Sequence, residues 1–326
     1  MIKRRLSAAE SCYPTRIFWR IYLRTHKPNE IAHLRHCRLL YASRLFVLKI
    51  QIFVYDKTVQ NSACAKTFRG LILVLMKSIV ITSGKGGVGK TTVTACLGRA
   101  LAALGNRVAL LDADFGLNNL DVVLGLENRV VYDITDVIEN RCRVRQALIE
   151  ADVRNLYLLP SAHGYQGESV SAQNIKLVLN GLAVTFDYAL VDCPAGIEAG
   201  FNRAVGACDS AIVVTTPHIS ALRDANKVVS LLSSYRMTPT LVINRVRGDL
   251  LADGKIPDKD EIERILKARV DGVIPETDGV YDLNAMPAKP FELLAKRIHL
   301  GTGEPLDLAA GYRGFFGAIK RRMRRG

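Results

Sequence analysis

The chain reads Ser83-Gly84-Lys85-Gly86-Gly87-Val88-Gly89-Lys90-Thr91-Thr92 between an apolar run at residues 79–81 and a segment with helical character at residues 93–104. A glycine-rich loop that follows a strand and opens a helix is the context of the G-x-x-x-x-G-K-[ST] phosphate-binding pattern. A glycine turn without a ligand is the alternative interpretation, and the complete pattern in this context favours phosphate binding.

The residue types of this loop suit a nucleotide phosphate and its metal ion. Glycine lets the backbone wrap closely, so that successive N–H groups and the N-terminus of the following helix can face phosphate oxygens. Lys90 brings a positive charge to the β- and γ-phosphates, and the Thr91 hydroxyl is suited to Mg²⁺. The predicted nucleotide-binding residues of the loop are Gly84, Lys85, Gly86, Gly87, Val88, Gly89, Lys90, Thr91 and Thr92.

Two apolar strands are predicted to end in carboxylates. The strand at 107–111 is followed by Asp112 and Asp114, and the strand at 188–192 ends in Asp192. Parallel sheets covered on both faces bind their ligands at the carboxyl ends of the strands. We therefore expect Asp112 and Asp114 near the phosphates, and Asp192 in the position of a Walker B acid that holds Mg²⁺.

The hydrophobic pattern predicts an α/β fold with a doubly wound, mostly parallel sheet of six to eight strands, in one domain at residues 76–300. Predicted strands cover 77–82, 107–111, 155–159, 188–192, 209–215, 240–243 and 270–274. Predicted helices cover 91–104, 172–186, 220–235 and 258–268.

Positive charge is concentrated at the two ends of this chain, whose formal net charge is +14. Residues 1–75 carry 14 Lys and Arg against 3 acidic residues, and residues 311–326 carry 6 against none. The body between them therefore has a net charge of −3, which disfavours a nucleic-acid-binding surface. Residues 1–75 lack clear periodicity and a signal-peptide layout, so they are read as a basic extension: disordered, an organelle transit peptide, or translated only through a mis-assigned start. We favour a true start at Met76.

The cysteines and histidines show no metal-binding pattern. The seven cysteines include no C-x-x-C pair, which indicates reduced thiols. Cys96 and Cys208 are expected to pack as small hydrophobic residues. The three histidines of the body are isolated, and we expect no metal at His163, His218 or His299.

The form GKGGVGKTT, with Lys85 directly after the first glycine, resembles the deviant Walker A loop of the MinD/ParA family of ATPases. Residues 112–121 and 193–198 resemble the switch I and switch II segments of its MinD members, and residues 130–139 also match them. The resemblance covers about residues 76–326. It implies a slow ATPase with ATP and Mg²⁺ as cofactors, in which Lys85 reaches the partner's nucleotide across an ATP-bound homodimer.

The resemblance also implies roles for individual side chains. The catalytic residues would be Lys85, Lys90, Asp114 and Asp192, with Thr91 and Asp192 at the metal. Asp114 would position the attacking water. The remaining nucleotide contacts would be Asp112 beside the γ-phosphate, Gly196 reporting its loss, Asn244 at the adenine and Pro275 against the base. Asn118 stands where family members commonly carry arginine.

A short basic amphipathic helix is predicted at residues 312–326, after a linker at 301–311. At about 100° per residue its apolar side chains share one arc, with basic residues beside it, as in helices that lie on anionic membranes. A last helix docked on the domain is the alternative. The predicted membrane-binding residues are Tyr312, Phe315, Phe316, Ile319, Lys320 and Met323.

The resemblance implies a MinD-like ATPase of division-site selection, cytoplasmic and peripheral on the inner face of the cell membrane, or plastidic if residues 1–75 are a transit peptide. It would recruit a MinC-like inhibitor of FtsZ assembly, and a MinE-like or other topological factor would be its second partner. ATP hydrolysis would release the ATPase from the membrane. The alternatives are a MinD-like regulator of flagellar number, a ParA-type partition ATPase and an iron protein of the nitrogenase-reductase kind. The acidic body disfavours DNA-bound ParA, and Cys193 and Cys208 do not have the spacing of an iron protein.

Overall fold

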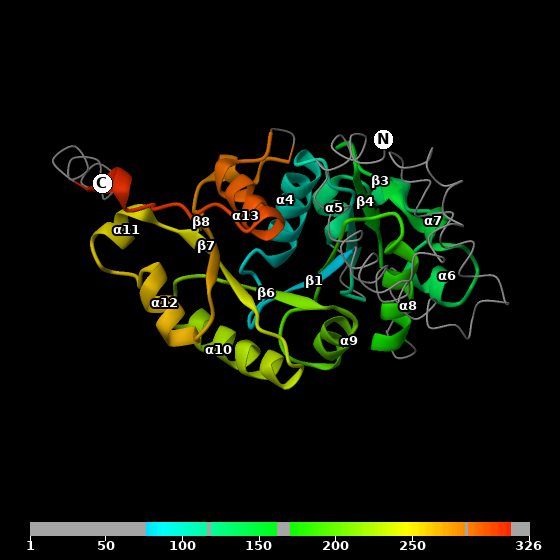
Figure 1. The fold of residues 1–326 in the computed structure, drawn as a ribbon, viewed down its shortest axis with the longest axis horizontal. Helices are drawn as coiled ribbons and strands as arrows, with labels where there is room; N and C mark the ends of the chain where they lie inside the picture. Colours follow the sequence, from blue (N-terminus) through cyan, green and yellow to red (C-terminus); the bar gives the residue numbers. More distant parts are fainter. Residues whose placement is uncertain (1–75, 116–118, 162–169, 284–285, 314–326) are drawn as a thin grey trace, which may run out of the picture. The chain divides into compact units, whose positions relative to one another are not determined.

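Eight strands form one sheet in the computed structural model, which describes residues 76–115, 119–161, 170–283 and 286–313 (Figure 1). The strand order is β3-β4-β2-β5-β1-β6-β7-β8. All neighbouring strands are parallel except β3, which pairs antiparallel with β4. The strands are β1 (Lys77–Thr82), β2 (Val108–Asp112), β3 (Ile149–Glu150), β4 (Leu156–Leu159), β5 (Tyr188–Asp192), β6 (Ser210–Thr215), β7 (Thr240–Val246) and β8 (Val270–Pro275).

The prediction of a doubly wound, mostly parallel sheet is confirmed. All seven predicted strands are present, and β1 and β5 begin and end at the predicted residues. β3 was not predicted, because two residues at the edge of a sheet leave no periodic pattern in the sequence.

Helices cover both faces of the sheet (Figure 1). α4, α5 and α13 pack on one face, and α8, α9, α10 and α12 pack on the other. The sequence predicted α4, α8, α10 and α12 but not the others. The helices are α4 (Lys90–Ala103), α5 (Leu120–Leu124), α6 (Ile134–Ile138), α7 (Val144–Ala147), α8 (Ala172–Leu182), α9 (Ala199–Ala207), α10 (Ile219–Ser234), α11 (Gly248–Ala252), α12 (Lys259–Leu266) and α13 (Lys289–Leu300), with short 3₁₀ turns at Glu127–Arg129, Asp278–Tyr281 and Ala310–Tyr312.

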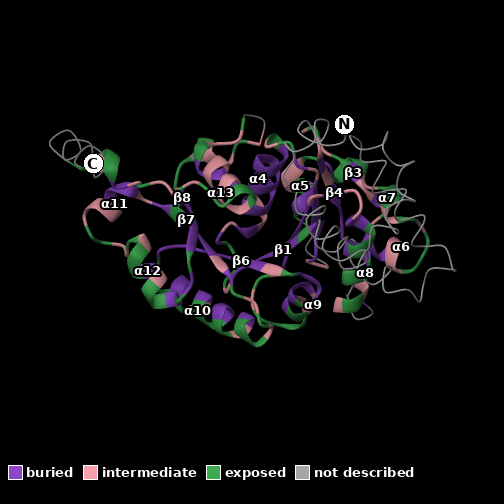
Figure 2. Cartoon of the chain, viewed as in Figure 1, coloured by how far each residue is buried: buried purple, intermediate pink, exposed green. Residues whose placement is uncertain are grey.

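The core consists of two apolar layers separated by the sheet. Successive side chains of a strand point to opposite faces, so Ile79 and Ile81 of β1 pack toward α4 and α13, whereas Val80 packs in the other layer. Figure 2 shows that the central strands and most of α4 are buried, while α10 is buried on one side and exposed on the other. Cys96 and Cys208 are buried in these layers, as predicted.

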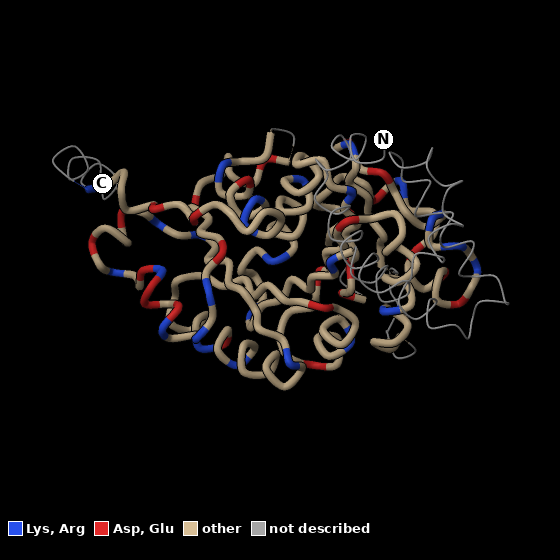
Figure 3. Tube along the Cα trace, viewed as in Figure 1, with Lys and Arg blue, Asp and Glu red and all other residues tan. Residues whose placement is uncertain are grey.

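Charges of both signs are interspersed over the outer helices of the described residues, α12 included, and the middle of the sheet is largely uncharged (Figure 3). Among these residues, no helix is both long and apolar enough to cross a bilayer.

The last described residues pack against α11. α13 ends at Leu300, with Gly301 in the left-handed conformation (φ 70°). The turn Ala310–Tyr312 then lies beside α11, where the Tyr312 ring is 2.7 Å from the position that a Cβ on Gly248 would take (Figure 1). Tyr312 is half-buried by this packing. The predictions that lie outside the described residues concern the segment 1–75 and the side chains of Asn118, His163, Phe315, Phe316, Ile319, Lys320 and Met323.

Candidate nucleotide-binding site

The glycine-rich loop links β1 to α4, as the sequence predicted. Gly87 and Gly89 have positive φ angles of 78° and 89°, in the region that L-residues with a Cβ seldom occupy. Gly89 is the N-cap of α4, and no side chain of the described residues caps this helix, so its first N–H groups remain available for an anion. A Cβ on Gly84 would collide with the backbone carbonyl of Asp224 in α10. The loop therefore has both the backbone conformation and the helix end that a phosphate group requires.

The strand register brings the two Walker-type carboxylates together. Asp192 at the end of β5 pairs with Asp112 of β2 on one side and with Ile81 of β1 on the other. Because β1 leads into the loop, both carboxylates lie at the edge of the sheet beside it. The sequence predicted this placement from the parallel order of the strands.

Asp192 is held by α4. Its Oδ1 accepts a hydrogen bond from Lys90 Nζ at 3.1 Å and from Thr94 Oγ1 at 3.2 Å. The two charged side chains are 10% and 2% exposed. The pKa of Asp192 is raised above its usual value, mainly by burial. The Lys90 charge and hydrogen bonds from Thr91, Lys90 and Thr94 oppose this rise. Thr94 was not predicted to contact Asp192, although its position one turn after Lys90 places both residues on the same face of α4.

Asp112 is buried and accepts three backbone hydrogen bonds. Its carboxylate oxygens accept from the N–H groups of Asp114 at 2.9 Å and of Asn119 and Leu120 at 3.2 Å. Burial, with the Asp192 charge as a second cause, nevertheless raises the pKa of Asp112 to about 7. The Asp112 carboxyl group therefore holds the backbone at both ends of the loop that begins the switch I segment.

Asp114 and Gly196 lie on the two switch segments beside the loop. Asp114 is half-buried; burial is the main cause that raises its pKa, and Lys90 opposes that rise. Its carbonyl oxygen accepts a hydrogen bond from Ser161 Oγ at 3.2 Å. The Gly196 N–H donates to the carbonyl of Ser83 at 3.3 Å, and Gly196 has a φ of 92°. Both predicted residues are thus brought to the phosphate loop.

Asn244 contacts the loop from the other side. Its side chain is buried, and Nδ2 donates to the Val88 carbonyl at 2.8 Å. A Cβ on Gly89 would lie 2.5 Å from the same nitrogen. The β7–β8 ladder shifts register between Ile243 and Val246, and Arg245 has a φ of 54°, an irregularity of the kind that redirects side chains near functional sites.

The Asn244 amide has a second partner that the sequence did not suggest. Tyr281 donates its hydroxyl hydrogen bond to Asn244 Oδ1 at 2.7 Å, from the segment that follows β8. Pro275, which the sequence assigned to the base, ends β8 and pairs with Val246. No motif marks Tyr281, so only the structure could find it.

The other predicted loop residues differ in exposure. Lys85 is exposed, whereas Thr91 and Thr92 are half-buried at the start of α4. The Ser83 hydroxyl donates to the Lys85 carbonyl at 3.0 Å, which ties the loop backbone together while the lysine side chain remains open to solvent.

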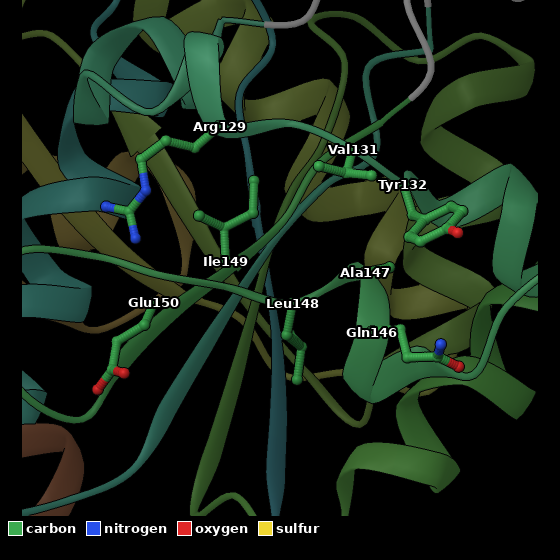
Figure 4. Close-up of a pocket in the computed structure, with 8 residues that line it drawn as sticks. All are labelled: Arg129, Val131, Tyr132, Gln146, Ala147, Leu148, Ile149 and Glu150. Carbon is green, nitrogen blue, oxygen red and sulfur yellow. The ribbon is translucent and has the colours of Figure 1, made fainter.

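A pocket of about 230 Å³ lies elsewhere, at the β3 edge of the sheet (Figure 4). Arg129 and Glu150 lie at one end of it, and Tyr132 and Gln146 at the other. None of the predicted nucleotide-binding residues lines this pocket. This pocket is therefore separate from the glycine-rich loop.

The described histidines have no metal-binding neighbours. Tyr188 Oη and His299 Nδ1 are 3.1 Å apart, and their rings meet edge to face. Over the described ranges of the chain, no group of three or more His, Cys, Asp or Glu side chains is arranged to hold a metal ion. A metal at the loop would need the mixed set of the Thr91 hydroxyl, the Asp192 carboxylate and the phosphates themselves.

Known proteins resemble this chain over most of its described residues. Residues 79–287 match the family described as the CobQ/CobB/MinD/ParA nucleotide binding domain. The septum site-determining protein MinD of Bacillus subtilis is 46% identical over 248 residues, which are 71% of this chain and 92% of that protein.

Solved structures give the same assignment. The MinC:MinD cell division protein complex of Aquifex aeolicus has a chain with 39% identity and a TM-score of 0.63, covering 71% of this chain and 98% of that one. MinD of Pyrococcus horikoshii, solved with Mg-ADP, has 30% identity and a TM-score of 0.59, covering 69% and 96%. These matches do not favour the flagellar, partition or iron-protein alternatives. The chain belongs to the MinD family of septum site-determining proteins, within the CobQ/CobB/MinD/ParA nucleotide-binding domains.

Proposed function

We propose that this MinD-type division-site ATPase is a membrane switch controlled by ATP. The single observation that supports control by ATP most directly is the cluster of Lys90, Asp192 and Asp114 at the N-terminus of α4, which brings a cation for phosphate together with carboxylates suited to Mg²⁺ and to the attacking water. Hydrolysis, slow in isolation and stimulated by a partner, would set the lifetime of the active state.

Each residue of the cluster has a distinct task in this proposal. Bound ATP supplies the phosphoryl group and Mg²⁺ neutralises its charge. Lys90 would contact the β- and γ-phosphate oxygens in place of Asp192, and Thr91 and Asp192 would hold the metal. Asp114 accepts a hydrogen bond from the attacking water and orients it. The Gly196 N–H would donate its hydrogen bond to the γ-phosphate in place of the Ser83 carbonyl. Gly196 would therefore move when the γ-phosphate is lost.

Lys85 is the residue that we assign to dimer formation. It is exposed in this chain although it belongs to the phosphate loop, so its charge is available to a nucleotide held by a second copy. An ATP-bound homodimer would therefore have two lysines at each nucleotide, Lys90 from one copy and Lys85 from the other.

The membrane anchor is assigned to residues 312–326, after the linker 301–311. Tyr312 packs on Gly248 in the ligand-free chain and would have to leave α11 to join the anchor. The other apolar residues of the anchor are Phe315, Phe316, Ile319 and Met323, and Lys320 is one of its six basic residues. Each basic residue near an anionic surface contributes about 1 kcal/mol. One such segment binds weakly, and two on one dimer bind much more tightly through effective concentration. ATP would thus control location by controlling dimerisation.

The partners follow from the same family. The A. aeolicus complex of MinC with MinD supports a MinC-like inhibitor as the protein recruited to the membrane. A MinE-like or other topological factor would stimulate hydrolysis, and the protein would then return to the cytoplasm. Residues 1–75 have no task in this scheme.

Vesicle sedimentation tests the proposal. The full chain and a chain that begins at Met76 are each mixed with phosphatidylglycerol-containing vesicles in Mg-ATP or Mg-ADP, with and without residues 314–326. We expect binding in ATP that is at least tenfold tighter than in ADP, and that is lost on truncation. A Phe315→Asp, Phe316→Asp variant serves as a control that keeps the basic residues. Equal binding in both nucleotides, or binding by the truncated chain that begins at Met76, contradicts the switch.

A further inference from the structure

Tyr281 is the feature of the site that the proposed function does not use. Its hydroxyl donates to Asn244 Oδ1 at 2.7 Å, while its ring meets Phe291 of α13 edge to face, with the ring centroids 6.4 Å apart. Phe291 is buried, and Tyr281 is half-buried. The hydroxyl is therefore held by a fixed ring and not by a mobile surface side chain.

The two partners of the Asn244 amide hold its two ends. The Val88 carbonyl can only accept, and it faces Nδ2; the Tyr281 hydroxyl, which can donate or accept, donates to Oδ1. Rotating the amide by 180° would place Oδ1 against the Val88 carbonyl oxygen, where two acceptors repel one another. Val88 therefore fixes which end of the amide is the nitrogen, and Tyr281 adds a second hydrogen bond that holds the amide in place.

The orientation of this amide decides which purine it can read. A side-chain amide has two N–H groups and two lone pairs on oxygen, so one of each remains after Val88 and Tyr281 are satisfied. Asn244 is 1% exposed in the ligand-free chain, so the binding of a base has to uncover this pair. This pair matches the edge of adenine, which offers an acceptor at N7 and a donor at the N6 amino group. Guanine has acceptors at both N7 and O6, and its O6 would face the Asn244 oxygen.

We propose that Tyr281 is a positioning residue of the base site, which holds the Asn244 amide, in the orientation that Val88 sets, where it accepts adenine and disfavours guanine. This inference rests on the proposed function and on the adenine contact that the family resemblance implies for Asn244. It concerns base selection and is independent of hydrolysis, dimerisation and membrane binding.

The chain offers a matched control. Tyr235 also donates its hydroxyl to an asparagine oxygen, Asn202 Oδ1, at 2.8 Å, but at an exposed position between α9 and the end of α10. Tyr235→Phe therefore removes the same chemical bond from a place that touches neither the loop nor Asn244. Tyr281→Phe removes the hydroxyl and keeps the ring against Phe291.

The test measures dissociation constants of Mg-ADP, Mg-GDP and inorganic tripolyphosphate by calorimetry, for the full chain and for Tyr281→Phe, Tyr235→Phe and Asn244→Ala. We expect Tyr281→Phe to lower the preference for ADP over GDP by about 2- to 10-fold, the range for one hydrogen bond. Tripolyphosphate affinity should change less than twofold. Tyr235→Phe should leave all three constants unchanged.

The outcomes separate the two proposals. An unchanged purine preference in Tyr281→Phe, with a reduced one in Asn244→Ala, overturns the role of Tyr281 alone. If Asn244→Ala binds ADP as tightly as the unaltered chain, the adenine contact itself is wrong. The unaltered chain gives a second measurement, which needs no variant: purine riboside diphosphate lacks the N6 amino group and should bind at least twofold more weakly than ADP. Equal binding of these two ligands overturns the inference.

Discussion

Lys90 Nζ and Asp192 Oδ1 form an ion pair at 3.1 Å between the first residue of α4 and the last residue of β5, with both side chains buried. In the nucleotide-bound state that we propose, Lys90 would contact phosphate and Asp192 would hold Mg²⁺, so the two side chains would no longer pair with one another. In the ligand-free protein, the ion pair therefore gives each of these two buried charged groups an oppositely charged partner.

The first prediction concerns this pair. Lys90→Met leaves the buried Asp192 without its counter-charge, and should lower the free energy of unfolding of the ligand-free protein by about 3 kcal/mol. The double variant Lys90→Met, Asp192→Asn should recover most of this loss, because neither position then leaves an unpaired buried charge. Urea unfolding in a chelator measures both values. Equal stabilities of the single and double variants would show that the pair is not coupled.

A second prediction concerns Asp114. Asp114→Ala should keep ATP binding and dimerisation but lower the hydrolysis rate at least about 100-fold, as expected for a residue that orients the attacking water. Phosphate release and analytical ultracentrifugation in ATP measure the two properties. Asp260→Ala, at an exposed position on α12, is the control and should hydrolyse ATP at the normal rate. An unchanged rate in Asp114→Ala refutes the assignment.

The third prediction is a pH dependence due to Asp112. Its pKa is raised from 3.8 to about 7, so between these values the folded protein holds a proton that the unfolded chain has released. The free energy of unfolding of the ligand-free protein should therefore fall as the pH rises from about 4 through about 7. Asp112→Asn should flatten this slope. Unfolding curves at four or five pH values in a chelator give the result, and an equal slope in both proteins would contradict it.

A fourth prediction separates two glycines of the loop. A Cβ at Gly84 meets the Asp224 backbone, whereas a Cβ at Gly86 finds only the Ala195 methyl group, at 3.9 Å. Gly84→Ala should thus destabilise the ligand-free protein by about 1–3 kcal/mol, and Gly86→Ala should not. Thermal unfolding compares them directly. A comparable loss in Gly86→Ala would show that loop flexibility, and not space, sets the requirement for glycine at position 84.

Much of the fold could be predicted because its central strands are apolar on both faces. β1 and β5 were found to the residue, since buried parallel strands read as continuous apolar runs bounded by polar residues. α9 and α13 were missed for the opposite reason: one is rich in alanine and glycine, and the other carries charges along much of its length. Their apolar faces become evident only once the sheet supplies the surface that they cover.

The site was predictable where a motif or the strand order determines it. The phosphate loop follows a sequence pattern, and Asp112 and Asp192 are placed by parallel strands that end at one edge. Tyr281 was not predictable, because its contact with Asn244 joins residues 37 positions apart and depends on how the chain returns after β8. Side chains that position other side chains generally leave no trace in a single sequence.

The packing of Tyr312 on Gly248 limits how far the domain can lie from a membrane that binds the residues after Arg313. Phe315 follows Arg313, the last described residue, by two positions, so the chain spans at most about 7 Å between them. If Phe315 enters a bilayer, the α11 end of the sheet has to lie almost on the lipid surface. β3, at the far side of the eight-stranded order, then lies about 30 Å away along the sheet. Such a short connection limits how far the domain can tilt and keeps the β3 edge of the sheet away from that surface.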